Sequence, residues 1–369
     1  MENQLAHPSA HISPDDVNII RKHAAEAEQL GLLHAEQLDI VYREGWFKLL
    51  IPHGYTGKQI TLSNLVRLQE AISWTDGSTG WVVTLCSGAG WFGGFINAGL
   101  SQQIFANPCV CLAGSGAVGG TAEKVGDDYI INGFWKYASG IHHATHITAN
   151  CAITQNGEPV LGDDGEPLVL PFVFDRKDIT LVPAWKYMGM VATGSDAFEI
   201  KELRVDKTRA FKIDPGAAVV DVPLYRYPFL QLAEATLAVN LSGMALHFMD
   251  LCADVFNERM NHPRLTRSQK VILIDTLALA NKEMGALRHK FFEAVDVSWG
   301  DIAQNNVVSE ANLLAVSAAS RKLAISAREI VDRLYPLCGL IAAGADTEIN
   351  RAWRDLHTAS QHTLLTFPT

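Results

Sequence analysis

Residues 114–140 read GSGAVGGTAEKVGDDYIINGFWKYASG. The first six match the pattern GxGxxG, which in dinucleotide-binding folds ends a strand and opens a helix that holds a pyrophosphate. Here a Gly-Asp-Asp turn at 126–128 follows, and an apolar run then starts at Tyr129. No acidic residue lies in 135–140, where such folds place one about 20 positions after the glycines. The segment therefore predicts strand, turn and strand, with Gly114–Gly119 in a loop at the rim of a sheet, and argues against a Rossmann fold.

The β pattern extends on both sides of this segment. Short apolar runs alternate with turn signals such as Gln155-Asn156-Gly157, which is typical of antiparallel strands joined by hairpins. The predicted strands are Cys109–Ala113, Tyr129–Trp135, His146–Thr154, Leu168–Phe174, Ile179–Val182 and Ala197–Val205.

Helical patterns flank the β region. Apolar residues recur at spacings of three and four before it and again after it, over stretches long enough for a bundle. The predicted helices are 14–30, 34–43 and 63–74, then 229–259, 266–298, 307–335 and 346–365. We therefore predict an α+β protein with a helical N-terminal domain (1–108), an antiparallel β middle domain (109–222) and a C-terminal four-helix bundle (223–369).

A long uncharged stretch lies where the first helices meet the β region. From Gly77 to Ala122 the chain has no Asp, Glu, Lys or Arg over 46 residues, although 19% of all residues are charged. Eleven glycines and several amides interrupt the stretch, which argues against a membrane span. We expect it to be buried within the protein, either as packed core or as the wall of a largely apolar ligand cavity.

Charge and cysteine usage exclude several partners and compartments. Thirty basic residues against forty acidic ones give a net charge of −10 with no basic run, so no nucleic-acid partner and no membrane partner are expected. Arg21 is the first basic residue, so no secretory signal is expected. The six cysteines form no CxxC pair and are typical of reduced thiols in a cytoplasmic protein.

Five segments, in order, resemble motifs of the acyl-CoA dehydrogenase superfamily. Ile131–Gly140 (INGFWKYASG) resembles its "NGxKxWITN/ASG" strand. Asp76–Trp81 (DGSTGW) resembles a helix of one branch, the flavin-dependent monooxygenases that take reduced flavin from a separate reductase. The segments are Asp76–Trp81 (DGSTGW), Gly114–Gly120, Ile131–Gly140, Trp185–Ser195 (WKYMGMVATGS) and Arg351–Asp355 (RAWRD).

This resemblance implies a fold and a cofactor. Members have the helix, sheet and bundle order predicted above, are usually homotetramers, and hold flavin between the β domain and the bundle. By resemblance, Tyr137 would pack near the isoalloxazine, Ser139 beside Gly140 would hydrogen-bond near N5, and Gly114 and Ser115 would line the site. A flat uncharged ring needs such an apolar wall with few polar groups. The expected cofactor is reduced FMN or FAD.

The C-terminal segment distinguishes two reactions. Dehydrogenases of the superfamily use a glutamate shortly after the RxxRD helix, but here no carboxylate follows Asp355, and Thr363 stands near that place. A threonine hydroxyl cannot act as the base for this step, because its pKa is far too high for it to be ionised near pH 7. His362 is adjacent, and a histidine near this point serves monooxygenases of the family. On one continuous helix Asp355 and His362 would share a face, so both are candidate catalytic residues.

Other candidates follow from position. Trp91 in the uncharged stretch and His142 after Ser139-Gly140 are candidate substrate contacts, and Arg264 is a candidate ligand of the flavin phosphate. His142 and His146 are four apart in a loop leading into a strand, a setting that does not build a metal site, so no metal is expected.

The preferred hypothesis is an oxygenase component that hydroxylates an aromatic or apolar small molecule with reduced flavin from a separate reductase. Two alternatives stay open: an acyl-CoA dehydrogenase with a displaced base, which would oxidise a CH–CH bond with FAD, and a non-catalytic member of the fold.

Overall fold

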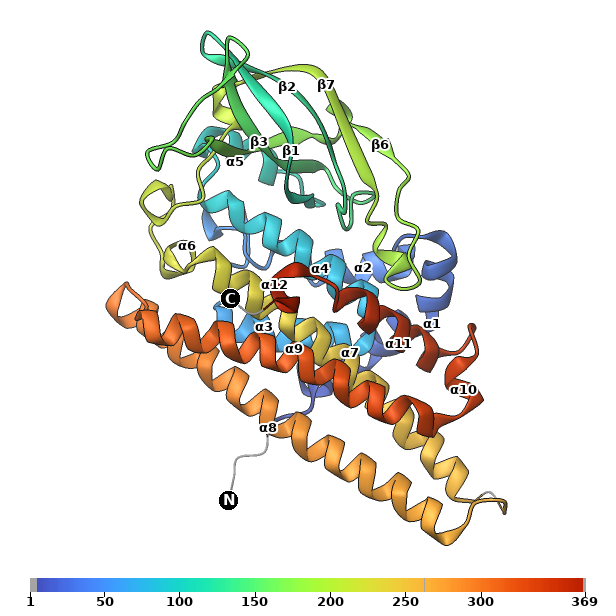
Figure 1. Ribbon diagram of the computed structural model, residues 1–369. Helices are drawn as coiled ribbons and strands as arrows, with labels where there is room; N and C mark the ends of the chain where they lie inside the picture. The colour runs from blue at the N-terminus through green and yellow to red at the C-terminus, as the bar shows by residue number, and fades with distance from the viewer. Residues whose placement is uncertain (1–4, 262, 368–369) are drawn as a thin grey trace.

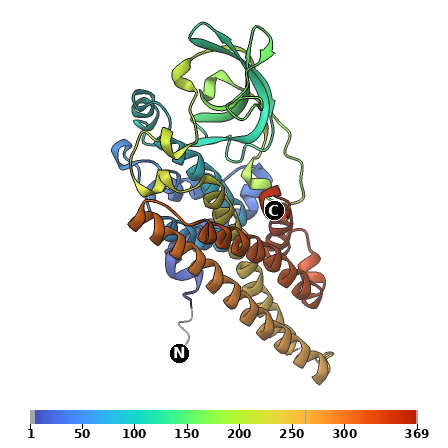
Figure 2. The ribbon, with the colours of Figure 1, turned by 60° about the vertical axis from the view of Figure 1, so that its left-hand side comes forward.

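The computed structural model describes residues 5–261 and 263–367. A curved β region lies across one end of a layered set of helices, and the two longest helices extend away from it (Figures 1 and 2). Along the chain, helices come first, then strands, then long helices. The α+β class and the acyl-CoA dehydrogenase-like order of elements predicted from the sequence are confirmed.

Within the described residues, five α-helices precede the sheet. They are α1 (Pro14–Leu30), α2 (Ala35–Arg43), α3 (Leu62–Thr75), α4 (Gly77–Gly90) and α5 (Ala98–Phe105). Pro14 at the first turn starts α1, whose bounds match the predicted 14–30. Asp76 caps α4, because its carboxylate accepts a hydrogen bond from the Thr79 N–H at 2.8 Å. α4 is the first part of the uncharged stretch, is almost entirely buried, and contacts both the sheet and the bundle.

The sheet has seven strands and is mixed. The strands are β1 (Leu112–Val125), β2 (Asp128–Trp135), β3 (His146–Gln155), β4 (Glu158–Pro159), β5 (Val169–Asp175), β6 (Thr180–Val182) and β7 (Ala197–Asp206). Their order is β4-β3-β1-β2-β7-β6, and β5 pairs with β3. The expectation of a purely antiparallel domain is wrong at one place, because β1 and β3 run parallel. Residues 136–145 return the chain from the end of β2 to the start of β1 before β3 begins.

The glycine-rich segment 114–119 is part of β1 and not a loop at the rim, which corrects the sequence interpretation. Register shifts occur between Ser115 and Val118 and between Val118 and Gly120. The glycines make room for the Trp135 indole, since a Cβ on Gly120 would lie 2.5 Å from that ring. The predicted strand–turn–strand is confirmed, because β1 and β2 form an antiparallel hairpin.

The C-terminal part forms the bundle. Its elements are α6 (Pro223–Arg226), α7 (Phe229–Met260), α8 (Arg267–Asn305), α9 (Glu310–Cys338), α10 (Leu340–Ala343), α11 (Glu348–Ala359) and α12 (Thr363–Thr366). α7 lies at its centre and contacts α3, α4, α8, α9 and α11. Within the described residues, α7 is the one helix long and apolar enough to cross a membrane, but 83% of its most apolar window is buried inside the protein, as expected of a core helix.

The last predicted helix, 346–365, is broken in two. α11 ends at Ala359, and the Ser360 hydroxyl donates to the His357 carbonyl oxygen at 3.1 Å. His362 then caps α12. The expectation that Asp355 and His362 share one helical face is therefore wrong, because the helix stops between them.

Candidate functional site

A pocket of about 280 Å³ lies where the sheet meets the helices. β1 and β3 form one wall, α4 and α7 form the other, and the chain after α11 closes one side. The lining is mostly apolar or glycine: Leu85, Gly88, Ala89, Phe92, Gly114, Gly116, Ala149, Pro171, Ile213, Phe229, Leu232, Ala233, Leu237 and Leu364. The polar residues that line it are Thr84, Ser115, Thr148, Asn150, Thr236 and His362.

Several of these polar groups are already engaged with the protein. The Thr236 hydroxyl donates to the Leu232 carbonyl oxygen at 2.9 Å, and the Thr84 hydroxyl accepts from the Asn240 side-chain amide at 2.8 Å. The Asn150 amide donates to the Gly116 carbonyl oxygen at 2.8 Å and so ties β3 to the irregular part of β1. The pocket therefore offers few free polar atoms, as expected of a site for an apolar molecule.

His362 lies at the edge of the pocket in a defined tautomer. Its Nδ1 accepts the N–H of Leu364 at 3.4 Å, so the proton of the neutral ring is on Nε2. Burial lowers the pKa of His362, which keeps the ring neutral near pH 7. The imidazole is therefore a donor through Nε2–H. Its ring centroid lies 6.1 Å from that of Trp81 on α4.

A chain of hydrogen bonds runs from Trp81 through three hydroxyls. The Trp81 indole donates to Ser139 Oγ at 3.2 Å, Ser139 pairs with Ser195 at 2.8 Å, and Ser195 pairs with Thr193 at 2.7 Å. Thr193 donates to the Met190 carbonyl oxygen at 2.6 Å. Because the last proton goes to a carbonyl, Ser195 must donate to Thr193, and Ser139 must donate to Ser195. Ser139 thus keeps one lone pair that accepts no hydrogen bond from the described residues.

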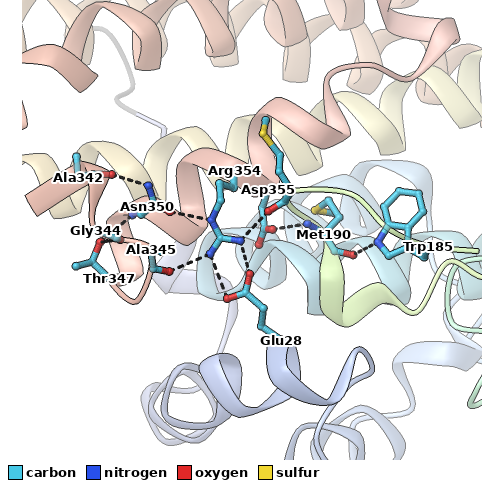
Figure 3. Close-up of polar contacts among 11 residues, drawn as sticks. Glu28, Trp185, Met190, Ala342, Gly344, Ala345, Thr347, Asn350, Arg354 and Asp355 are labelled. Carbon is cyan, nitrogen blue, oxygen red and sulfur yellow. Dashed lines mark hydrogen bonds and ion pairs between the residues drawn. The ribbon is translucent and has the colours of Figure 1, made fainter.

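The loop that carries Thr193 and Ser195 is held at both ends. Near its start, the backbone N–H groups of Ala184 and Trp185 donate to Asp196 Oδ1 at 2.7 and 2.9 Å. Farther along, the Met190 N–H donates to the Asp355 carboxylate of α11, and the Trp185 indole donates to the Met190 carbonyl oxygen (Figure 3). These bonds fix the hydroxyl chain relative to the bundle.

Asp355 is buried next to a second acidic group. Burial, and then the charge of Asp76, raise the pKa of Asp355 to about 7. Its neighbour Arg354 pairs with Glu28 of α1, which ties α11 to the N-terminal helices (Figure 3). Asp355 is not among the residues that line the pocket, and its contacts are those of an anchor for the Met190 loop.

Comparison with known proteins agrees with this geometry. The family model described as "Acyl-CoA dehydrogenase, C-terminal domain" matches residues 235–367.

Residues 235–367 are therefore similar to the C-terminal domain of acyl-CoA dehydrogenases.

Three known proteins extend the likeness over nearly the whole chain. The flavin-dependent monooxygenase oxygenase subunit HsaA of Rhodococcus jostii is 22% identical over 362 residues, 93% of this chain and 91% of its own. Indole-3-acetate monooxygenase of Pseudomonas putida is 24% identical over 352 residues, 94% and 87%. The crystal structure of XiaF from Streptomyces sp. in complex with FADH2 and glycerol has a TM-score of 0.84 at 20% identity, covering 95% and 89%.

The predicted site residues fall into two groups around this pocket. Gly114, Ser115 and His362 line it together. Ser139 is buried beside it in the hydroxyl chain, and Gly140 follows with φ of 75° and its N–H bonded to the Thr193 carbonyl oxygen. Sequence segments more than 200 residues apart thus meet at one place.

Trp91, Tyr137 and His142 do not line the pocket. Trp91 is 1% exposed, donates to the Leu224 carbonyl oxygen at 2.9 Å, and packs behind the wall. Tyr137 is 57% exposed and shares a hydrogen bond of 3.3 Å with Tyr187. His142 bonds the Asp196 carboxylate at 2.9 Å and so supports the same loop from outside.

Arg264 lies in the connection between α7 and α8. In both ribbon views this connection is at the end of the bundle away from the sheet. Arg264 is not among the described residues that line the pocket.

Sequence reasoning missed three residues of the site. Trp81 and Ser195 are the last residues of two of the motifs above, but the sequence did not single them out as site residues. A tryptophan N–H and a serine hydroxyl at those positions were the available signal. Asn150 gave no signal, because an isolated amide within a strand is indistinguishable from a solvated one. Only the pairing of β1 with β3 places it at the pocket.

A cluster of His23, Glu26 and His34 near the end of α1 has the composition of a metal site. The two imidazole rings, however, are stacked with centroids 4.2 Å apart and planes 8° apart. A metal lies in the plane of each imidazole that binds it, so parallel rings do not direct both lone pairs at one ion. His34 Nδ1 also accepts the Glu36 N–H, which leaves its proton on Nε2. In this geometry the cluster holds His34, which caps the start of α2.

Proposed function

We propose that the protein is the oxygenase component of a two-component monooxygenase that inserts one oxygen atom into an aromatic or apolar small molecule. A separate reductase would supply reduced FMN or FAD. The observation that carries the proposal is the pocket wall, where His362 stands and no carboxylate is among the described lining residues. Proton abstraction from an acyl-CoA needs a base at this place, and neutral His362 offers a donor. The relatives named above, two monooxygenases and an FADH2 complex, support the same reading.

The residues present fit a flavin. Nothing lies within 4 Å of where a Cβ would stand on Gly88 or Gly116, so both walls leave open space for a flat ring. Reduced flavin carries an N–H at N5, and Ser139 keeps one lone pair after its bonds to Trp81 and Ser195. A donor on the ring and an acceptor on the protein are complementary.

In this proposal bound reduced flavin would supply the two electrons that activate O₂ for transfer of one oxygen atom. The protein's residues would do the rest. Trp81 and Ser195 would hold Ser139 in place for the ring, the apolar wall of α4 and α7 would exclude water, and His362 Nε2–H would donate to the substrate oxygen. This arrangement stabilises negative charge on that oxygen without adding a positive charge to the pocket.

We further propose a cytoplasmic homotetramer. Apolar side chains along the outer face of α8 support self-association: Val271, Ile272, Ile274 and Leu279 are each about half exposed in the single chain. The neutral-to-acidic charge balance and the unpaired cysteines support the compartment.

Isotope incorporation tests the function. The purified protein is given photoreduced FMN or FAD and ¹⁸O₂ together with a panel of phenols and indoles, and products are analysed by mass spectrometry. We expect one ¹⁸O atom in the product and one in water. Absence of label from every product, together with bleaching of bound FAD by an acyl-CoA, would establish the dehydrogenase instead. Failure to bind either reduced flavin would favour a non-catalytic member.

A further inference from the structure

We propose that the pocket selects uncharged aromatic substrates and discriminates against aryl carboxylates. The inference rests on the proposed function and names the substrate class of the same site. It is drawn from the charges, the polar atoms and the size of the pocket.

No described residue that lines the pocket is Asp, Glu, Lys or Arg. The cations of the surrounding elements are paired elsewhere: Arg209 with Asp175 beside β5, and Arg354 with Glu28 beyond α11. Lys212 precedes the lining residue Ile213 but is exposed at the surface. A carboxylate inside this pocket would therefore lose its hydration and gain no ionic partner, which strongly disfavours its binding.

The free polar atoms match a neutral hydroxyl or ring N–H. Within the described chain, His362 Nε2 and Asn150 Oδ1 form no hydrogen bond, and the Ser115 hydroxyl only accepts one, from the Ala117 N–H at 3.4 Å. The site thus presents two donors and an acceptor, all uncharged near pH 7 because burial lowers the pKa of His362. Phenols, hydroxylated rings and indoles offer complementary groups.

The size of the cavity sets an upper limit. A volume of about 280 Å³ is just below the usual range for ligand pockets, so a substrate that shares this crevice with a flavin ring must be small, with one or two rings at most. One relative, indole-3-acetate monooxygenase, is named for a carboxylate substrate. Our inference predicts that the present chain differs from that relative in charge preference despite the shared fold.

Matched ligand pairs test the preference without turnover. Dissociation constants are measured anaerobically, by quenching of tryptophan fluorescence, for indole-3-acetamide against indole-3-acetate and for 4-hydroxyphenylacetamide against 4-hydroxyphenylacetate. Each pair differs in charge at nearly constant shape. We expect each amide to bind at least about 10-fold more tightly than its acid, the equivalent of ~1.4 kcal/mol. A smaller preference in both pairs, or no binding of either amide, overturns the proposal.

A variant pair locates the cause. Ala233 on α7 lines the pocket and is only partly buried, so a longer side chain there is tolerated. Ala233→Lys should raise the acid-to-amide affinity ratio at least about 10-fold, while Ala233→Gln, of similar length and no charge, should leave it unchanged. An unchanged ratio in Ala233→Lys overturns the assignment of the preference to this pocket.

The same samples separate this inference from the proposed function. Binding of reduced FMN and FAD is measured first, and the ligand pairs are then titrated with and without flavin. Loss of flavin binding with a retained amide preference would remove the monooxygenase proposal and keep the charge selectivity. Flavin binding and hydroxylation with equal affinity for acids and amides would keep the monooxygenase proposal and remove the charge selectivity.

Discussion

At the scale of single residues, His362 combines a structural and a chemical role. Its Nδ1 caps α12, and its Nε2–H belongs to a neutral ring whose pKa burial has lowered. The two roles can be separated by two substitutions. Asparagine can cap the helix but cannot replace the imidazole in the chemistry, whereas alanine can do neither.

We predict that His362→Ala and His362→Asn both reduce hydroxylation by about 100-fold or more, the range of a lost acid–base or donor group. His362→Ala should in addition lose about 1 kcal/mol of unfolding free energy, whereas His362→Asn should retain most of it. Product formation and denaturant unfolding measure the two effects. Hydroxylation at the wild-type rate by His362→Asn would remove His362 from the chemistry.

Trp81 tests the hydroxyl chain. Trp81→Phe keeps an aromatic ring in α4 but removes the donor to Ser139, so Ser139 becomes free to rotate. We expect reduced flavin to bind about 3- to 10-fold more weakly, as for one lost neutral hydrogen bond. Anaerobic flavin titration measures this affinity, and Trp74→Phe, which removes an indole donor to Asp250 of α7 and does not change a residue that lines the pocket, is the control. An affinity equal to that of the wild type would show that Ser139 does not depend on Trp81.

At the scale of elements, the loop between β6 and β7 connects the hydroxyl chain to α11 through Met190 and Asp355. The pKa of Asp355 is raised to about 7 in the folded protein, above its unfolded value of 3.8. A carboxyl group whose pKa is raised in the folded protein stabilises the fold fully below its unfolded pKa of 3.8. This contribution is lost as pH rises through the folded pKa of about 7. The anchor of this loop is therefore sensitive to pH.

We predict that the unfolding free energy falls between about pH 4 and pH 7, and that Asp355→Asn removes on the order of a few kcal/mol of that fall. Urea unfolding at a series of pH values measures it. Asp254→Asn, an exposed carboxylate of α7, is the matched control and should keep the wild-type profile. An Asp355→Asn profile parallel to that of the wild type would contradict the assignment.

The turn after Ser139 is the second element-scale test. Gly140 has φ of 75°, and a Cβ there would lie 2.6 Å from Cys86 Sγ on α4. Gly140→Ala should therefore cost about 1–3 kcal/mol of unfolding free energy and move Ser139, weakening flavin binding. Thermal unfolding and flavin titration check both effects. Gly157→Ala, also at positive φ but in an open hairpin, should weaken stability without changing flavin affinity.

The sequence predicted these elements unevenly, for physical reasons. Regular periodicity and caps marked α1, and β2 and β3 were placed to within a residue or two. Gly114–Gly119 was misassigned because glycines carry no side-chain alternation, while their use, room for Trp135, depends on a distant residue. The break before His362 was invisible because Ser360 and His362 fit a continuous helical pattern until their side chains bond the backbone. The pairing that brings Asn150 to the pocket is a tertiary property.

At the scale of the whole molecule, the site exists only where three parts of the chain meet. The sheet contributes Gly114 and Ser115, the segment between β2 and β3 contributes Ser139, α4 contributes its partner Trp81, and the end of the bundle contributes His362. Each part has its own core contacts, so their junction can hold a flat cofactor without the fold depending on it. Stability should therefore rise with reduced flavin by mass action, as RT ln(1 + [L]/Kd).

The most direct test of this account is an anaerobic crystal structure of the protein with reduced flavin. We predict electron density for the isoalloxazine in the pocket between the sheet and α4 and α7, with its N5 edge toward Ser139 and with His362 facing it from the edge of the same pocket. Density for the flavin elsewhere on the protein, or a His362 ring turned away from a flavin that occupies this crevice, would contradict the central claim.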